Sequence, residues 1–190
     1  MPTSFKSDPT FWKNYWRSIY GAPRTWAMKG ENLVHAFEAL CEASDRTSIQ
    51  FNLHDQAFML AGMGVEVMLK AILVNDPKLR QLFCGDRHPI NSRERDLCKT
   101  FYSHKLEALA QAAGVPLTIP LREVAESLSS YIYWRGRYVV PTERGIDDLV
   151  PIEHSNGLVG PPLRQISIEE ASDLIKLIIA TVHTRLGNAA

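Results

Sequence analysis

Apolar residues recur at helical spacing from Asn52 to Val74 and form two neighbouring stripes. One stripe consists of Ala57, Ala61, Val65, Met68 and Ile72, and the other of Phe58, Gly62, Leu69 and Leu73. Because two stripes imply contacts on two sides, the pattern predicts a helix buried inside a bundle. Gly62 and Gly64 each cost about 1 kcal/mol in a helix relative to alanine, so they predict close approach by a neighbouring helix.

Four other segments show one apolar face each and are predicted to be helices: 24–44, 104–114, 121–134 and 167–187. Gly30 has low helix propensity and could split the first of these helices. Ser103 is predicted to cap the helix that starts near His104. Ser167 and Glu170 have the spacing of a capping box, which fixes the start of the last helix.

The predicted helices make an all-α fold, an up-and-down bundle of four to five helices with two long loops. The loops are residues 78–102 and 139–165, where polar residues, prolines and glycines gather. Within the first loop, short helical turns are expected at Leu79–Phe83 and Arg95–Phe101. Long loops in compact domains are often functional, so both loops are candidate parts of a site.

An aromatic N-terminal segment, residues 1–23, precedes a single helical domain over 24–190. Its large apolar residues have helical spacing and are Phe11, Trp12, Tyr15, Trp16, Ile19 and Tyr20. We expect this segment to pack on the bundle. A contact between subunits is the alternative.

The net charge and the cysteine count limit the partners and the cellular compartment that we expect. Lys and Arg together number 21, as do Asp and Glu, so no net charge draws the chain toward nucleic acid or anionic lipid. The three cysteines, Cys41, Cys84 and Cys98, are widely spaced and odd in number. This argues against a disulfide framework and against the paired ligands of a zinc site. We therefore expect a cytoplasmic protein with no metal and no other cofactor.

The stretch 57–74 approaches the length of a membrane span. Glu66 and Lys70 lie at its middle, where each charge would cost about 2.5–3.5 kcal/mol in lipid. The N-terminal residues also lack the apolar region of a secretory signal. A core helix is therefore expected, and no membrane association.

Three polar residues near the buried helix could carry chemistry. Glu66 and Lys70 are four residues apart, glutamate first, which favours an ion pair. The pair either lies half-exposed on the only wet strip of the helix, or lines a shared groove or orients loop residues. His104 opens a helix, where a charged imidazole is unfavourable, so a neutral, hydrogen-bonded ring is expected. His104 either ties the first long loop to the bundle or acts in general acid–base catalysis.

Arg135 and Arg137 follow the aromatic end of the predicted helix 121–134. Cations suit a helix C-terminus, and arginines interleaved with aromatic rings also suit phosphate contact and base stacking. No phosphate-binding P-loop, dinucleotide fingerprint, His-Glu-x-x-His pair or nucleophile elbow occurs. The sequence therefore holds no complete catalytic or metal-binding motif.

Three segments resemble the HEPN domain family (higher eukaryotes and prokaryotes nucleotide-binding). Residues 58–73 are similar to its "LAGYAxExxLKALL" helix, with Glu66 and Lys70 in the matching places. Residues 103–109 are similar to "GHDLxxL", although Lys105 replaces the usual acid, and residues 133–141 are similar, less closely, to its "RYP" segment. The order and spacing agree with the family over about residues 50–141, with 167–187 as the closing helix.

The resemblance implies a helical bundle that forms a homodimer and takes part in RNA cleavage or nucleotide binding. It also implies a bacterial toxin–antitoxin or phage-defence system, in which a nucleotidyltransferase antitoxin is one protein partner to expect. We include Glu66, Lys70, Tyr102 and Tyr138 as candidate ligand-binding residues.

The chain departs from the RNase members of the family. Those members place an arginine and a histidine with four to six residues between them, and no arginine in this chain does so. We therefore expect a HEPN-like module that binds a nucleotide, RNA or a protein partner without the standard RNase activity. One alternative is an atypical metal-independent endoribonuclease with His104, Arg135 and Arg137 as catalytic residues. Another is a structural protein that dimerises as a scaffold.

Overall fold

The computed structural model describes residues 14–15, 17–19, 21–46, 53–84, 87–135, 152–153, 159–160 and 165–187. Its main elements are α2 (Pro23–Arg46), α3 (His54–Asn75), α4 (Pro77–Phe83), α5 (Ser92–Phe101), α6 (Leu106–Ala112), α7 (Ile119–Ser130), the π-helix η1 (Tyr131–Arg135) and α9 (Ile168–Leu186). The predicted all-α bundle is confirmed. Inside the second long loop, two strands of two residues each, β1 (Ile152–Glu153) and β2 (Val159–Gly160), pair antiparallel. So short a pair leaves the fold class unchanged.

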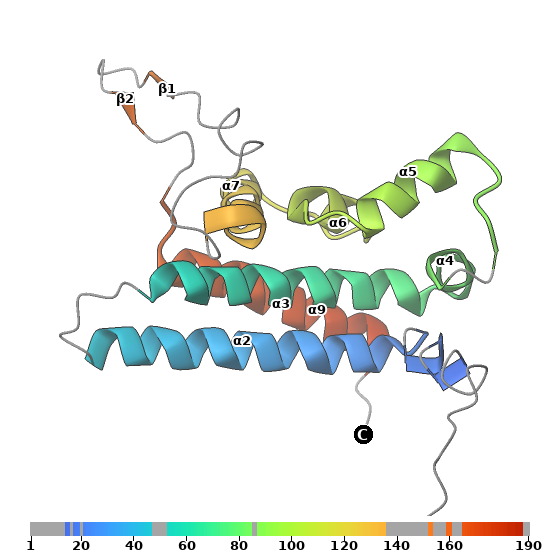
Figure 1. The fold of residues 1–190 in the computed structure, drawn as a ribbon, viewed down its shortest axis with the longest axis horizontal. Coiled ribbons are helices and arrows are strands. Elements are labelled where there is room, and N and C mark those ends of the chain that lie inside the picture. Colours follow the sequence, from blue (N-terminus) through green and yellow to red (C-terminus); the bar gives the residue numbers. More distant parts are fainter. Residues whose placement is uncertain are drawn as a thin grey trace, which may run out of the picture.

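The helices are arranged around α3 (Figure 1). The helices α2 and α3 run side by side in opposite directions, whereas α7 is seen nearly end-on and crosses them. Direct contacts join α3 to α2, α4, α6, α7, η1 and α9. The prediction of a helix inside a bundle is therefore confirmed.

The apolar helix α3 is largely buried inside the bundle. Met68, Ala57 and Ala61 have no exposed surface. Among the described residues, α3 alone has the length and composition of a membrane span, with a mean hydropathy of 1.9, and 78% of that window is buried inside the bundle. The mostly buried core helix of a globular protein passes the same test, so the composition of α3 is weak evidence for a membrane span.

Glycines bring α2 and α3 into backbone contact. A Cβ at Gly30 would lie 2.9 Å from the Gly64 carbonyl oxygen and 2.4 Å from Met68 Cγ. On another side of α3, a Cβ at Gly62 would lie 2.9 Å from Ile132 of η1. The close approach predicted from Gly62 and Gly64 is confirmed, and α2 continues through Gly30 without a break.

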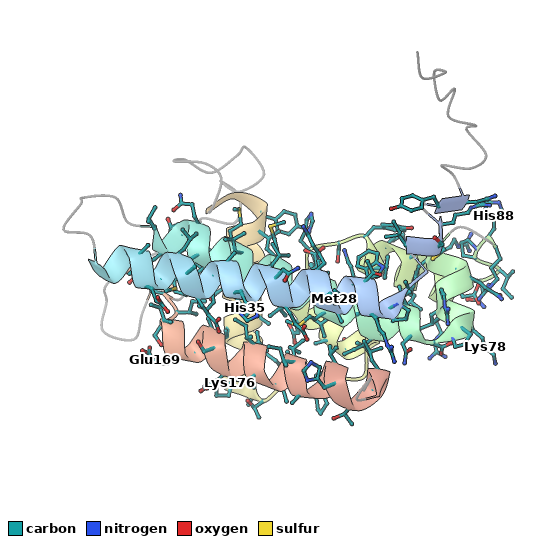
Figure 2. The ribbon with its side chains drawn as sticks, turned by 90° about the horizontal axis from the view of Figure 1, so that it is seen from below. Met28, His35, Lys78, His88, Glu169 and Lys176 are labelled. Atoms are coloured by element: carbon teal, nitrogen blue, oxygen red, sulfur yellow. The ribbon has the colours of Figure 1, made fainter. Side chains whose placement is uncertain are left out.

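The last helix is fixed by its cap and by polar contacts. Ser167 and Glu170 form the predicted capping box, which satisfies two N–H groups at the start of α9. Near the other end, His183 Nε2 lies 2.8 Å from Glu31 Oε1 of α2. Figure 2 shows α2 and α9 side by side, with Met28 and His35 on α2 and Lys176 on α9.

The predicted cap of α6 is wrong. Lys105, not Ser103, occupies the N-cap position, and its side chain makes no capping bond. The Ser103 hydroxyl instead donates to the Thr100 carbonyl at 2.8 Å. The Leu106 N–H is satisfied from another helix, because it donates to the Ser129 hydroxyl of α7 at 3.0 Å.

The predicted helix 121–134 changes character after Ser130, where α7 gives way to η1. The Ser129 hydroxyl donates to the Ala125 carbonyl at 2.8 Å, and the Ser130 hydroxyl donates to the Ser127 carbonyl at 2.7 Å. Hydroxyls bound to these carbonyls compete with the α-helical backbone ladder and favour a local change in winding. The π-turn buries Tyr131 and Ile132 and leaves Tyr133 48% exposed.

Part of the aromatic N-terminal segment is described. Residues 14–15 and 17–19 are helical, and Tyr15 is 45% exposed. Its other aromatic residues lie outside the described residues: Phe5, Phe11, Trp12, Trp16 and Tyr20.

Candidate functional site

A buried ion pair lies at the centre of the candidate site. Glu66 and Lys70 project from successive turns of α3 and are only 7% and 8% exposed. Lys70 Nζ donates to Glu66 Oε1 at 2.6 Å. The half-exposed alternative for this pair is therefore wrong: α3 is covered on this side as well, and the pair replaces lost hydration with a short charge-assisted hydrogen bond.

His104 is the third member of this group. Its Nδ1 lies 2.8 Å from Glu66 Oε2, so the Glu66 carboxylate bridges the lysine and the imidazole. The His104 ring stands edge-on to Tyr133 of η1, with 5.3 Å between ring centroids, and its side chain is 40% exposed. The bond to Glu66 ties the α5–α6 connection to the bundle, and the His104 side chain stays partly exposed.

Lys70 also faces a pocket of about 180 Å³. Its lining comes from α2, α3, α4 and α5 and from the residues that follow α4 and α5: Trp26, Lys70, Val74, Phe83, Cys84, Phe101 and Tyr102. Lys70 Nζ lies 5.4 Å from the centroid of the Phe101 ring. The pocket therefore combines one buried cation with apolar, mostly aromatic walls.

Stacked rings fix the shape of these walls. Phe83 and Phe101 lie almost parallel, with 4.1 Å between centroids, and Trp26 meets Phe101 edge-on at 5.9 Å. The Tyr102 hydroxyl donates to the Phe83 carbonyl at 2.8 Å. Phe83 and Phe101 are each less than 5% exposed, so the pocket floor is part of the core.

Two short helices carry these rings to the pocket. The Asp76 side chain accepts from the Lys78 N–H at 2.7 Å and starts α4 directly after α3. Asn91 accepts from the Glu94 N–H at 2.9 Å and starts α5 earlier than the turn expected at residue 95. The helical turns predicted in the first long loop are confirmed, and their ends deliver Phe83 and Phe101.

Some of the candidate residues predicted from the sequence lie together in the structure, and the side chains of the others lie outside the described residues. The structure brings together Glu66, Lys70 and His104, and it places Tyr102 at the pocket with 67% of its surface exposed. Arg135 ends η1, but its side chain lies outside the described residues, as do Arg137 and Tyr138.

A bidentate ion pair closes the connection between α4 and α5. Arg87 donates to the two oxygens of Glu94 at 2.8 and 2.9 Å, and the Ile90 N–H donates to Glu94 at 3.0 Å. The Arg87 guanidinium, with help from the Ile90 N–H, lowers the pKa of the Glu94 carboxyl to about 2. The pair therefore holds the connection that separates the two pocket helices.

The stabilising effect of Glu94 is expected to persist into acid. The pKa of Glu94 in the folded protein lies below its ordinary value of 4.5. The contribution of Glu94 to the free energy of unfolding is therefore complete above about pH 4.5 and disappears as the pH falls toward about 2. Glu94→Gln should thus be less stable than wild type at neutral pH, and the difference should shrink below about pH 4.5. Urea unfolding at several pH values measures this difference.

The matched control is Asp96→Asn on the same helix, where the carboxylate lies at an exposed pair with Lys99. Its effect should be small at every pH. A Glu94→Gln deficit that stays constant down to pH 2 would contradict the assignment.

The described residues contain no group of three or more His, Cys, Asp or Glu side chains placed to hold a metal ion. Comparison of the chain with protein-family models, with curated proteins and with solved structures gave no match. The site must therefore be interpreted from its own chemistry.

Proposed function

We propose that this chain is a HEPN-like module that binds a nucleotide, free or as part of an RNA, in the pocket beside Lys70, and that it lacks the standard RNase activity. The single observation that carries the proposal is a lysine, nine-tenths buried, in the wall of an aromatic pocket. The resemblance adds the setting: a cytoplasmic homodimer in a bacterial toxin–antitoxin or defence system, with a nucleotidyltransferase as a protein partner.

Lys70 has donors to offer a ligand. An ammonium carries three N–H donors, and within the described ranges Glu66 is the only hydrogen-bond acceptor that Lys70 contacts. A donor left unused in a buried site is costly, whereas a ligand acceptor in the pocket would satisfy it. This imbalance favours a binding role over a purely structural one for the pair.

The aromatic walls suit a base. Trp26 and Tyr102 line the pocket together with Lys70. Contact between a base and aromatic side chains contributes about 1–3 kcal/mol per base and tolerates different base identities. One planar ring system and one hydrogen-bond acceptor are therefore the ligand features that the pocket can recognise.

Removal of the Lys70 ammonium is expected to weaken nucleotide binding by roughly 10- to 100-fold, the loss of one hydrogen bond to a charged donor. Lys70→Met alone would leave the buried Glu66 carboxylate without its cation. The variant to use is therefore Glu66→Leu/Lys70→Met, which replaces the ion pair by apolar side chains. Calorimetric titration with nucleoside monophosphates measures the change.

The matched control is Lys78→Met, which removes one exposed lysine from α4 (Figure 2). Lys78 is not among the residues that line the pocket. It should bind like wild type. Unchanged binding in the folded double variant would refute the proposal.

The Glu66–His104 bond favours a second candidate function, an atypical metal-independent ribonuclease. A carboxylate bound to one imidazole nitrogen holds the ring so that the other nitrogen can move a proton, as in general acid–base catalysis. Incubation of the pure protein with RNA and a chelator tests this candidate. Cleavage by wild type that is lost in His104→Ala and in Arg135→Ala/Arg137→Ala would support it, and no cleavage by wild type would reject it.

A further inference from the structure

We infer that the pocket beside Lys70 selects a single-ring base, a pyrimidine whose ring carbonyl accepts a hydrogen bond from the Lys70 ammonium, over a purine. This inference rests on the proposed function and deepens it by naming the ligand class. Three observations carry it: the size of the pocket, the stiffness of its walls and the charge balance around Lys70.

The pocket has room for one ring. An apolar protein cavity of about 150 Å³ binds benzene. At about 180 Å³, this pocket accommodates a six-membered ring with small substituents. A purine carries a second, fused ring, which would have to displace a wall or remain outside.

The inner walls resist displacement because they belong to the core, whereas Tyr102, which also lines the pocket, is 67% exposed. Val74 has no exposed surface, and Phe83 and Phe101 are 4% and 3% exposed. Movement of either ring would disturb their stacking at 4.1 Å as well as the edge contact of Phe101 with Trp26. Close-packed interiors of this kind respond to an added group of a few atoms with strain.

The charge balance favours a carbonyl over a phosphate. Glu66 Oε1 lies 2.6 Å from Lys70 Nζ, so a phosphate bound to this ammonium would also approach a carboxylate. The ion pair is neutral as a unit, and its attraction for an anion is correspondingly reduced. A neutral carbonyl oxygen needs only an N–H donor, which Lys70 retains. The phosphate of a nucleotide is thus expected to lie outside the pocket.

Titration of the full chain with uridine, cytidine, adenosine and guanosine, followed by calorimetry or ligand-detected NMR, tests the inference. We expect the pyrimidine nucleosides to bind at least about tenfold more tightly than the purine nucleosides, the discrimination that a pocket achieves against a group that does not fit. Uridine and its monophosphate should bind with similar affinity, and inorganic phosphate should not compete.

A Val74→Ala variant extends the test. Its larger pocket should admit purines and reduce the preference, and circular dichroism checks that it is folded. Purine binding equal to or tighter than pyrimidine binding, or displacement of the nucleoside by phosphate, would overturn the inference while the proposed function stands. If none of the nucleosides and monophosphates binds, the proposed function falls, and the inference with it.

Discussion

Glu66→Ala is expected to destabilise the fold by about 3 kcal/mol, because it leaves the Lys70 ammonium buried without its carboxylate. Lys70 is only 8% exposed and cannot recover full hydration without opening the packing of α3 against its neighbours. His104 loses its partner in the same variant, although its side chain is 40% exposed and can turn to water. Urea denaturation at neutral pH measures the free energy of unfolding.

Two controls separate the buried charge from other effects of the substitution. Glu66→Leu/Lys70→Met removes both charges, and we expect it to lie much closer to wild type than Glu66→Ala does. Asp96→Ala breaks an ion pair whose members are 78% and 70% exposed, and it should cost less than about 1 kcal/mol. Equal losses in the free energy of unfolding for Glu66→Ala and Asp96→Ala would contradict the prediction, because Lys70 would then have to be hydrated in the folded state.

Gly30→Ala is expected to destabilise the fold by about 1–2 kcal/mol, although alanine is the better helix former by about 1 kcal/mol. The added methyl would lie 2.9 Å from the Gly64 carbonyl oxygen, which is backbone and cannot move without shifting α3. The overlap with Met68 Cγ at 2.4 Å adds to this cost, because Cγ lies close to the backbone of a residue with no exposed surface. Thermal and urea unfolding measure the loss.

The matched control is Asn32→Ala on the same helix. Asn32 is exposed, so the variant gains helix propensity without a clash and should be as stable as wild type or slightly more stable. A Gly30→Ala variant that is also stabilised would show that α2 and α3 can separate at no cost.

The two-stripe pattern of α3 could be recognised from the sequence because every turn of a buried helix needs apolar partners. The same pattern did not show whether Glu66 and Lys70 are buried or exposed. A charged pair one turn apart could face solvent or a neighbour, and the choice depends on which residues cover it. Here His104 and Phe101 do so, and they come from segments far along the chain.

The pocket walls were harder to anticipate. Phe83 and Phe101 close helices of 7 and 10 residues, which contain too few turns for an apolar face to stand out from a polar loop. The sequence signal was the aromatic residue at the end of each expected turn. The resemblance to the HEPN family stays a prediction, and it drew attention to Glu66, Lys70 and His104 but not to the ring that joins Lys70 to the pocket.

The central position of α3 has a consequence for biosynthesis. This helix is complete at Asn75, whereas α9, which covers one of its sides, begins only at Ile168. At translation rates of about 5–20 residues per second, the ribosome needs roughly 5–20 s to make the chain between them. Throughout that interval the nascent chain carries a helix as apolar as a membrane span with one side uncovered. Aggregation and misdirection to a membrane are therefore the hazards of its synthesis, and early pairing of α2 with α3 is the protection that the order of the helices provides.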